Sequence, residues 1–414
     1  MNKFTRERIS FNQNNDIDKG VKVSNLISLV QGNEIGNALL NLLNVDSIKN
    51  EFIEIPNATA LVEFQKKINE RFHKEDIESS LEDMSLYSSN GDFSINFNNL
   101  ASNRYFETLG ISNICTAPIY SARNDFFSEL YQMDRYATQL IQNGYRDIVE
   151  MNWERLKQVT SFKKNYRILH DLEDNDFSLR AITSTKQYHN YDNNIAIVIA
   201  LLTLHNEMKG GAIKFRLSEF IINESFIKMF FESSEKMPLE GIGYVKNFIE
   251  VSNDEIKREA LRFSGACSIC FSDGQNIQGD LYIQPQEIST KILSIRHSVK
   301  PQTANQELAG IANSKKIHAE LFEDIKTIKN IQKPEQIKVL LQQKIENAKR
   351  EDIGNHKMQL QEILKQSASN IFQLLNIFSK IAVFAKEDVG VTEYLRIAIY
   401  EALIKRKSSS QSRF

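Results

Sequence analysis

The sequence has few of the residues that interrupt regular structure or cross-link a chain. Its 414 residues include six prolines, sixteen glycines and three cysteines. Because proline and glycine disfavour the interiors of helices and strands, their scarcity predicts long regular elements, mostly helices. An odd and small number of cysteines predicts no disulfide framework and fits a reducing compartment.

Long apolar runs are also lacking. The longest, 195–204, is shorter than the roughly 20 residues that span a bilayer as a helix. The first fifteen residues are polar and charged, without the apolar core of a signal peptide. We therefore expect a cytoplasmic protein that does not enter a membrane.

The chain has no strong net charge. Fifty-one lysines and arginines oppose 53 aspartates and glutamates, which gives −2 at pH 7. This balance argues against a surface that is basic all over, although a local basic groove remains open. The length allows one large domain or two to three smaller ones.

Several motifs of enzyme sites are missing. The sequence has no G-x-x-x-x-G-K-S/T, no G-x-G-x-x-G after a strand, no H-E-x-x-H and no G-x-S-x-G. Its seven histidines are scattered without metal-ligand spacing. These absences disfavour standard nucleotide hydrolysis, dinucleotide chemistry and hydrolase triads, and we expect no cofactor or bound metal.

The hydrophobic pattern predicts an α+β fold, with a mixed α/β central body and a predominantly helical C-terminal region. Apolar spacing predicts a helix over 60–72 and a buried helix over 195–208. The acidic segment 74–84 predicts a solvated helix. Strands are predicted at 92–98, 212–215, 219–222, 226–231, 245–251 and 266–271.

The same pattern divides the chain into four regions. We expect an N-terminal arm with helices and a small strand region at 1–97, and a mixed central domain at 98–300. A helical region at 301–407 and a disordered tail at 408–414 follow.

A basic and aromatic stretch is the first functional candidate. Lysine and arginine side chains can neutralise phosphates, and aromatic rings can stack on single-stranded bases for about 1–3 kcal/mol each. The alternative is a solvated helix face plus core tyrosines in a strand pair that holds the central sheet together. The candidates are Arg155, Lys163, Lys164, Tyr166, Arg167, Arg180, Lys186, Tyr188 and Tyr191.

Cys267 and Cys270 form the only closely spaced cysteine pair. A zinc site usually needs four ligands, often from two such pairs, and the sequence has no second pair. On a strand, residues three apart point to opposite faces. We therefore predict buried structural cysteines.

Glu255 and Lys257 form a Glu-x-Lys triplet after an apolar segment. In restriction-type nucleases such a triplet helps to hold Mg²⁺, together with an upstream carboxylate, for which Glu240 or Glu250 is the candidate here. A turn followed by an exposed charged helix explains the triplet equally well.

The C-terminal region carries a broad apolar stripe. It either packs on the body of the protein or joins copies of the chain, and we expect a homo-oligomer. The stripe consists of Phe372, Leu375, Phe378, Ile381, Ala382 and Ala385.

The centre of the chain resembles the phage/plasmid-like proteins of unknown function that recur on mobile genetic elements. The resemblance rests on Tyr166-Arg167-Ile168-Leu169, Leu179-Arg180-Ala181, Ser184, Tyr188 and Asp192-Asn193, with weaker similarity at Leu109-Gly110-Ile111, Pro118, 251–255 and Thr392-Glu393-Tyr394. Asp254 interrupts the serine-glutamate order of the family's turn, and Cys270-Phe271-Ser272-Asp273-Gly274 replaces its cysteine-asparagine-glycine element. The resemblance implies a phage, prophage or plasmid context and no catalytic residues.

Together these features predict a non-enzymatic nucleic-acid-binding protein of a mobile element, binding single strands as an oligomer. A metal-dependent nuclease and a protein-binding component in phage–host conflict are the alternatives.

Overall fold

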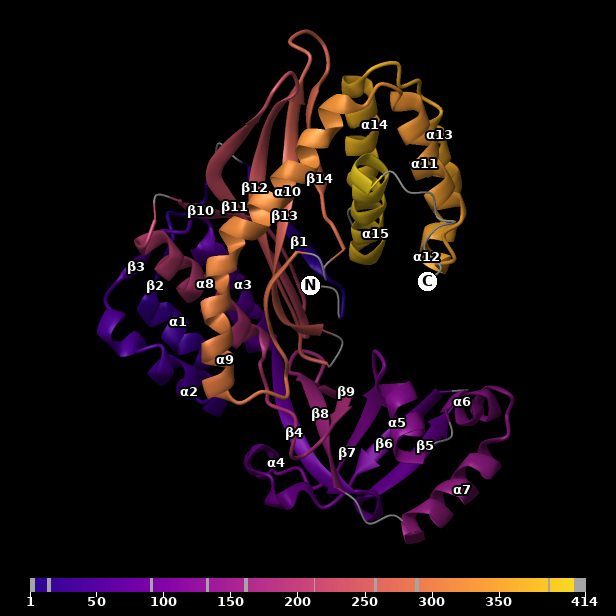
Figure 1. Ribbon diagram of the computed structural model, residues 1–414. Helices are drawn as coiled ribbons and strands as arrows, with labels where there is room; N and C mark the ends of the chain where they lie inside the picture. The colour runs from indigo at the N-terminus through magenta and orange to yellow at the C-terminus, as the bar shows by residue number, and fades with distance from the viewer. Residues whose placement is uncertain are drawn as a thin grey trace.

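The computed structural model describes residues 4–12, 16–89, 92–131, 134–159, 163–211, 213–256, 259–286, 290–385 and 388–405 (Figure 1). The predicted disordered tail and Lys257 of the Glu-x-Lys triplet lie outside these ranges. The described part mixes two large sheets with helices on their faces and edges, so the predicted α+β class is confirmed.

A seven-stranded antiparallel sheet forms the centre of the molecule. Its order is β1-β10-β11-β12-β13-β14, and β15 also pairs with β13. Alternate residues of its strands face opposite sides, so Ile227 and Met229 enter one core while Lys228 and Phe230 face the other side. The strands are β1 (Glu7–Ser10), β10 (Phe215–Ile222), β11 (Phe226–Leu239), β12 (Gly243–Asp254), β13 (Glu259–Ser272), β14 (Gln278–Ile283) and β15 (Lys291–Ile295).

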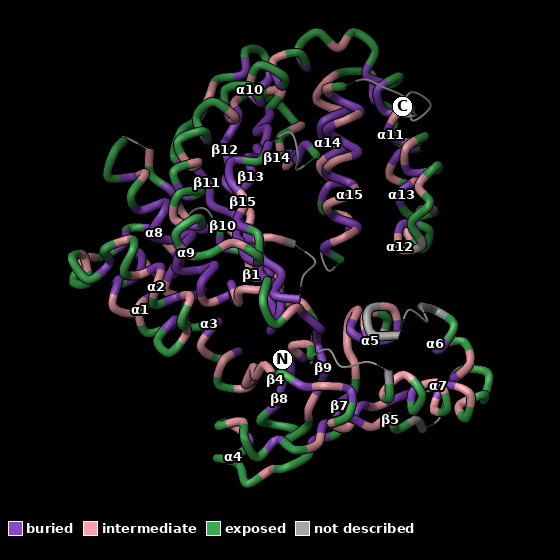
Figure 2. Tube along the Cα trace, turned by 60° about the horizontal axis from the view of Figure 1, so that its bottom comes forward, coloured by how far each residue is buried: buried purple, intermediate pink, exposed green. Residues whose placement is uncertain are grey.

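The long apolar run forms helix α8 (Asn193–Lys209), which packs against this sheet. Helices α1 (Val23–Val30) and α3 (Ala58–Arg71) cover it, and α2 (Glu34–Leu42) lies alongside α1. Nearly all of α8 is buried, as Figure 2 shows, because partners enclose it on several sides. The predicted buried helix is confirmed. A short ribbon, β2 (Val21–Lys22) with β3 (Phe52–Ile53), closes this end.

A second sheet of six strands has a separate core. Its order is β4-β8-β9-β7-β6-β5, and only the β7–β9 pair is parallel. Its helices are α4 (Arg104–Leu109), α5 (Ala122–Tyr131), α6 (Asp134–Gln142) and α7 (Arg146–Val159). Its strands are β4 (Phe72–Ser80), β5 (Met84–Ser89), β6 (Asp92–Phe97), β7 (Ile114–Pro118), β8 (Lys163–Asp171) and β9 (Asp176–Thr183).

The helix predicted over 74–84 is wrong. Residues 72–80 form β4, which pairs with β8 along its whole length and buries Ile77. Asp76 of β4 pairs with Arg167 of β8. An acidic residue of this segment therefore pairs with a residue of the neighbouring strand. A pattern within the segment itself cannot show such pairing.

The C-terminal helices form a third core with the β13–β14 side of the large sheet (Figure 1). Leu375, Phe378 and Ile381 of the apolar stripe are buried there within one chain. The helices of this core are α10 (Ser314–Lys326), α11 (Pro334–Glu346), α12 (Glu351–Gly354), α13 (Lys357–Leu364), α14 (Ile371–Ala382) and α15 (Val389–Tyr400), whereas α9 (Pro301–Leu308) packs in the core around α8.

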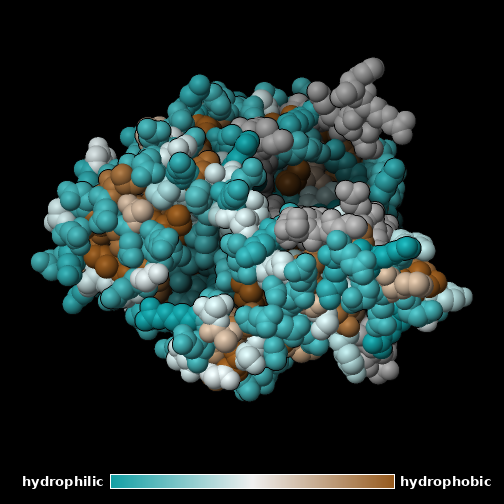
Figure 3. Space-filling model, turned by 90° about the horizontal axis from the view of Figure 1, so that it is seen from below, coloured by the Kyte–Doolittle hydropathy of each residue, from teal (hydrophilic) through white to brown (hydrophobic). Residues whose placement is uncertain are grey.

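The predicted strands at 92–98, 219–222, 226–231, 245–251 and 266–271 are present, most of them in longer strands, whereas β10 begins at Phe215. The six-stranded sheet continues across residue 97, where the sequence suggested a boundary, because β6 pairs with β7. Within the described residues no helix is long and apolar enough to cross a membrane. The face seen from below is mainly hydrophilic (Figure 3).

Candidate functional site

The structure does not bring the nine basic and aromatic candidates to one surface. Arg155 is exposed on α7, Lys163 and Lys164 lie at the start of β8, and Lys186 is exposed in the turn after β9. Residues 72–183, which contain most of them, hold 17 acidic and 11 basic residues. The net charge of this region therefore does not favour a polyanion.

The other candidates are mostly internal. Tyr166, Arg167, Arg180 and Tyr191 are fully buried, and Tyr188 is half-buried. The Tyr166 ring lies 5.1 Å from that of Phe97, and the Tyr191 hydroxyl donates to the carbonyl of Val299 at 3.0 Å. The four buried side chains offer no surface to a nucleic acid, and the two tyrosines among them are core residues.

Arg180 is instead part of a buried charge cluster centred on Glu255. Its guanidinium donates to one carboxylate oxygen of Glu255 at 2.6 Å, and Lys74 donates to the other at 2.6 Å. The backbone N–H of Asn193 also donates to this carboxylate, at 2.8 Å. We call Glu255, Lys74, Arg180 and Arg167 the Glu255 cluster.

Arg167 completes the Glu255 cluster from β8. Its Nε donates to Asp76 at 3.1 Å, and its terminal nitrogens bond to Asn190, to the Tyr188 hydroxyl and to the carbonyl of Glu255. The cluster thereby joins the β12–β13 turn of the large sheet to β4, β8 and β9 of the second sheet. These arginines hold two sheets together.

The electrostatics follow from burial and pairing. Burial by itself would raise the pKa of Glu255, but Lys74, Arg180 and Arg167 lower it well below its usual range. Burial lowers the pKa of Lys74, and its pairing with Glu255 opposes this. Burial raises the pKa of Tyr188 to about 12. The carboxylate of Glu255 is thus ionised and fully paired.

The nuclease alternative requires Glu255 and an upstream carboxylate to be available to a metal ion. Both oxygens of Glu255 are occupied by cations of the protein. Glu250 is paired with Lys228 at 3.0 Å, and Glu240 with Lys329 at 3.5 Å. Among the described residues no group of three or more acidic, histidine or cysteine side chains could hold a metal ion.

The cysteine pair lies on β13. Cys267 is fully buried and Cys270 is 5% exposed. Burial raises the pKa of the Cys270 thiol to about 12, so this thiol is protonated at neutral pH. The prediction of buried cysteines is confirmed.

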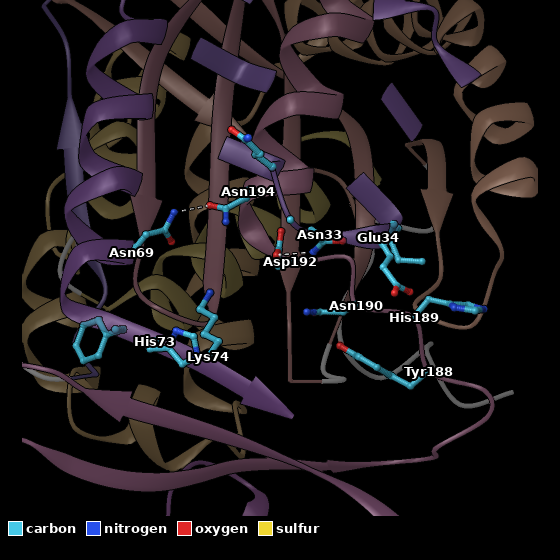
Figure 4. Close-up of a pocket in the computed structure, with 14 residues that line it drawn as sticks. Asn33, Glu34, Asn69, His73, Lys74, Tyr188, His189, Asn190, Asp192 and Asn194 are labelled. Carbon is cyan, nitrogen blue, oxygen red and sulfur yellow. Dashed lines mark hydrogen bonds between the residues drawn. The ribbon is translucent and has the colours of Figure 1, made fainter. Parts of the chain in front are cut away.

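A pocket of about 680 Å³ opens beside the Glu255 cluster (Figure 4). Its walls come from the turn between α1 and α2, the end of α3, the start of β4 and the segment that leads into α8. We call it the asparagine pocket. Its polar lining comprises Gln31, Asn33, Glu34, Asn69, His73, Lys74, Tyr188, His189, Asn190, Asp192 and Asn194.

Two amides of this pocket have fixed orientations. The side-chain oxygen of Asn190 accepts from Arg167, and that of Asn194 accepts from Asn69 at 3.0 Å. The amide nitrogens of Asn190 and Asn194 therefore remain as donors, and Figure 4 shows both directed between the lining residues. Figure 4 shows Lys74 next to His73, below Asn194.

Two helices begin at this pocket. Asn33 caps α2 through the N–H of Gly36 at 3.0 Å, and Asp192 caps α8 through the N–H of Ile195 at 2.9 Å. Asn33 also donates to Asp192 at 3.0 Å, which ties the two caps together. The pKa of Asp192 is raised, mainly by burial and secondly by the negative charge of Glu255. The partial positive charge of both helix ends favours an electron-rich ligand.

Sequence reasoning missed most of these residues. Asp192 before the long apolar run and Asn33 before 34–42 are N-cap signals that the sequence does contain. Asn69, Asn190 and Asn194 have no local signal, because only tertiary packing brings them together.

The chain matches no protein-family model, no curated protein and no solved structure. The similarity to phage/plasmid-like proteins therefore stays a prediction.

Proposed function

We propose that this chain is a non-enzymatic binding protein whose asparagine pocket holds a nucleotide, either free or as one unit of a single nucleic-acid strand. The observation that carries the proposal is the convergence of oriented amides in one open pocket beside two helix N-termini. A mobile-element origin, which the family resemblance implies, fits a nucleic-acid ligand.

The chemistry of the lining suits a nucleotide. An asparagine side chain can bond two neighbouring polar groups on the edge of a base. Glu34 and Asp192 supply acceptors for ribose hydroxyls or an exocyclic amine, while the N-terminal ends of α2 and α8 face acceptors such as phosphate oxygens. A volume of about 680 Å³ falls in the range of small-ligand pockets.

The proposal includes no reaction. The ionised groups next to the pocket already bond within the protein, since Glu255 holds Lys74 and Arg180. These groups fix the walls of the pocket and leave the amides to contact the ligand.

Two binding measurements test the proposal. The first is calorimetric titration with the four ribonucleoside monophosphates. The second is fluorescence anisotropy with labelled single- and double-stranded oligonucleotides over a salt series. Binding of mononucleotides indicates a free nucleotide, and binding of single strands alone indicates a strand unit. If micromolar protein binds none of these at low salt, the proposal fails.

Asn190→Asp and Asn194→Asp locate the site. Each keeps an oxygen for Arg167 or Asn69 but removes the donated N–H, so we expect roughly tenfold weaker binding or more. Asn330→Asp, at an exposed position after α10, should leave affinity unchanged. Equal affinity in all three variants would remove the asparagine pocket from consideration.

Single-strand binders commonly bind cooperatively along a strand. We therefore extend the proposal to a homo-oligomer that forms on the strand. Light scattering with and without oligonucleotide measures this, and a monomer under both conditions would contradict it.

A further inference from the structure

A second cavity lies on the opposite side of the large sheet from α8, beneath α15. Its volume is about 390 Å³, and its floor crosses strands β1 and β10–β14. We call it the Arg396 cavity. The Arg396 cavity and the asparagine pocket are distinct, because they share no lining residue.

Most charges in this cavity are paired with one another. Arg216 contacts Asp16 at 2.7 Å and Glu232 at 3.3 Å, and Lys246 contacts Glu232 at 3.1 Å. Arg8 of β1 lies 3.7 Å from Glu219 of β10. Asp280 is exposed at the rim.

Arg396 is different. Only 7% of it is exposed, yet its Nε is buried without a hydrogen-bond partner, and no ion pair joins its guanidinium to a described residue. Glu393, three residues earlier on α15, is bonded to the buried Lys228 instead. A buried guanidinium normally has anionic or hydrogen-bonding partners, because losing its hydration is costly.

Aromatic rings surround this cation. The guanidinium carbon lies 4.4 Å from the ring centre of Tyr282 and 5.9 Å from that of Phe230. The Phe248 ring is 5.1 Å from Tyr282 at a steep angle of 72°. The cavity therefore places an unpaired planar cation beside an apolar aromatic wall.

We propose that the Arg396 cavity binds a small organic carboxylate with an aromatic body. The carboxylate bonds to the guanidinium of Arg396 through two parallel N–H···O bonds, the geometry that arginine favours. The ring lies against Phe230 and Phe248. Such a ligand supplies both the missing anion and an apolar surface that matches the wall.

Benzoate is the probe, and benzamide is its neutral counterpart of the same shape. We expect benzoate to give saturable calorimetric binding and to raise the Tm of the full chain, whereas benzamide does neither. Equal binding of benzamide would overturn the anion's role. If inorganic phosphate binds more tightly than benzoate, the proposal that the ligand has an aromatic body is wrong.

Arg396→Gln should weaken benzoate binding at least about tenfold, because the charge is lost. Arg396→Lys keeps the positive charge but loses the two parallel N–H donors of the guanidinium. Its affinity for benzoate should therefore lie between those of the original chain and Arg396→Gln. Arg155→Gln, at an exposed arginine of α7, should bind as the original chain does.

The Tm without ligand separates binding from structure. Because Arg396 makes no ion pair to a described residue and would lose only its contacts with the rings of Tyr282 and Phe230, we expect ligand-free Arg396→Gln to melt close to the original chain. A lower Tm with unchanged benzoate affinity would show that Arg396 only supports the fold, and would refute the site.

Discussion

At the scale of single residues, Glu255 is the side chain whose partners matter most. A buried carboxylate is costly unless its charge is met, and here Lys74 and Arg180 meet it at 2.6 Å each. Removing the charge leaves two buried cations unpaired. We therefore expect Glu255→Gln to lower the free energy of unfolding by about 3–5 kcal/mol, as measured by urea denaturation.

Glu362→Gln is the matched control. Glu362 forms an exposed pair with Lys365, and such pairs contribute about 0–1 kcal/mol. A similar small loss in both variants would show that the Glu255 cluster does not stabilise the fold.

The low pKa of Glu255 also predicts acid sensitivity. Its ordinary value is 4.5, and in the folded protein it lies well below this. The stabilisation is therefore complete above about pH 4.5 and is lost as the pH falls through the folded pKa. Between pH 6 and pH 3 the stability of Glu255→Gln should fall less than that of the original chain. Parallel curves would assign the acid sensitivity to other groups.

At the scale of elements, the turn between β11 and β12 depends on one close backbone approach. Gly243 has φ +154°, and a Cβ there would lie 2.1 Å from the carbonyl oxygen of Cys270. Gly241 has φ +74° with nothing within 4 Å of a Cβ. Gly243→Ala should therefore shift the urea midpoint further than Gly241→Ala, which bears only about 1–2 kcal/mol of backbone strain. Equal shifts would contradict this.

Elements whose pattern lies within one segment could be predicted from the sequence. Helix α8, most strands of the large sheet and the left-handed cap at Gly110 follow from local apolar runs and turn residues. Strand β4 could not, because its acidic residues are matched by β8, about 90 positions away. The asparagine pocket could not for the same reason, since Asn33, Asn69 and Asn190 come from separate segments.

At the scale of the whole molecule, two bodies meet at the Glu255 cluster. The six-stranded sheet and its core are built entirely from residues 72–183, inserted between α3 and α8. The core around α8 is a different cluster, although Phe72 of β4 and Leu169 of β8 reach into it from the six-stranded sheet. Buried charges thus link the two bodies beside the apolar contacts of Phe72 and Leu169, so breaking the cluster should reduce the cooperativity between them.

Trp153 allows this coupling to be measured without a label. It is the only tryptophan in the sequence and is 2% exposed. Its ring stacks on that of Phe126, with 5.4 Å between the ring centres, in the core of the six-stranded sheet. Its fluorescence therefore follows that body, whereas far-ultraviolet circular dichroism follows the whole chain.

In the original chain we expect the two thermal transitions to coincide, which is the mark of cooperative unfolding. In Glu255→Gln the Trp153 transition should occur at a lower temperature than the dichroism transition, since the smaller body loses its charged link to the larger one. Glu362→Gln should keep both transitions together. Coincident transitions in Glu255→Gln would mean that the remaining contacts between the bodies are sufficient to couple them, and that the Glu255 cluster stabilises the molecule without making it cooperative.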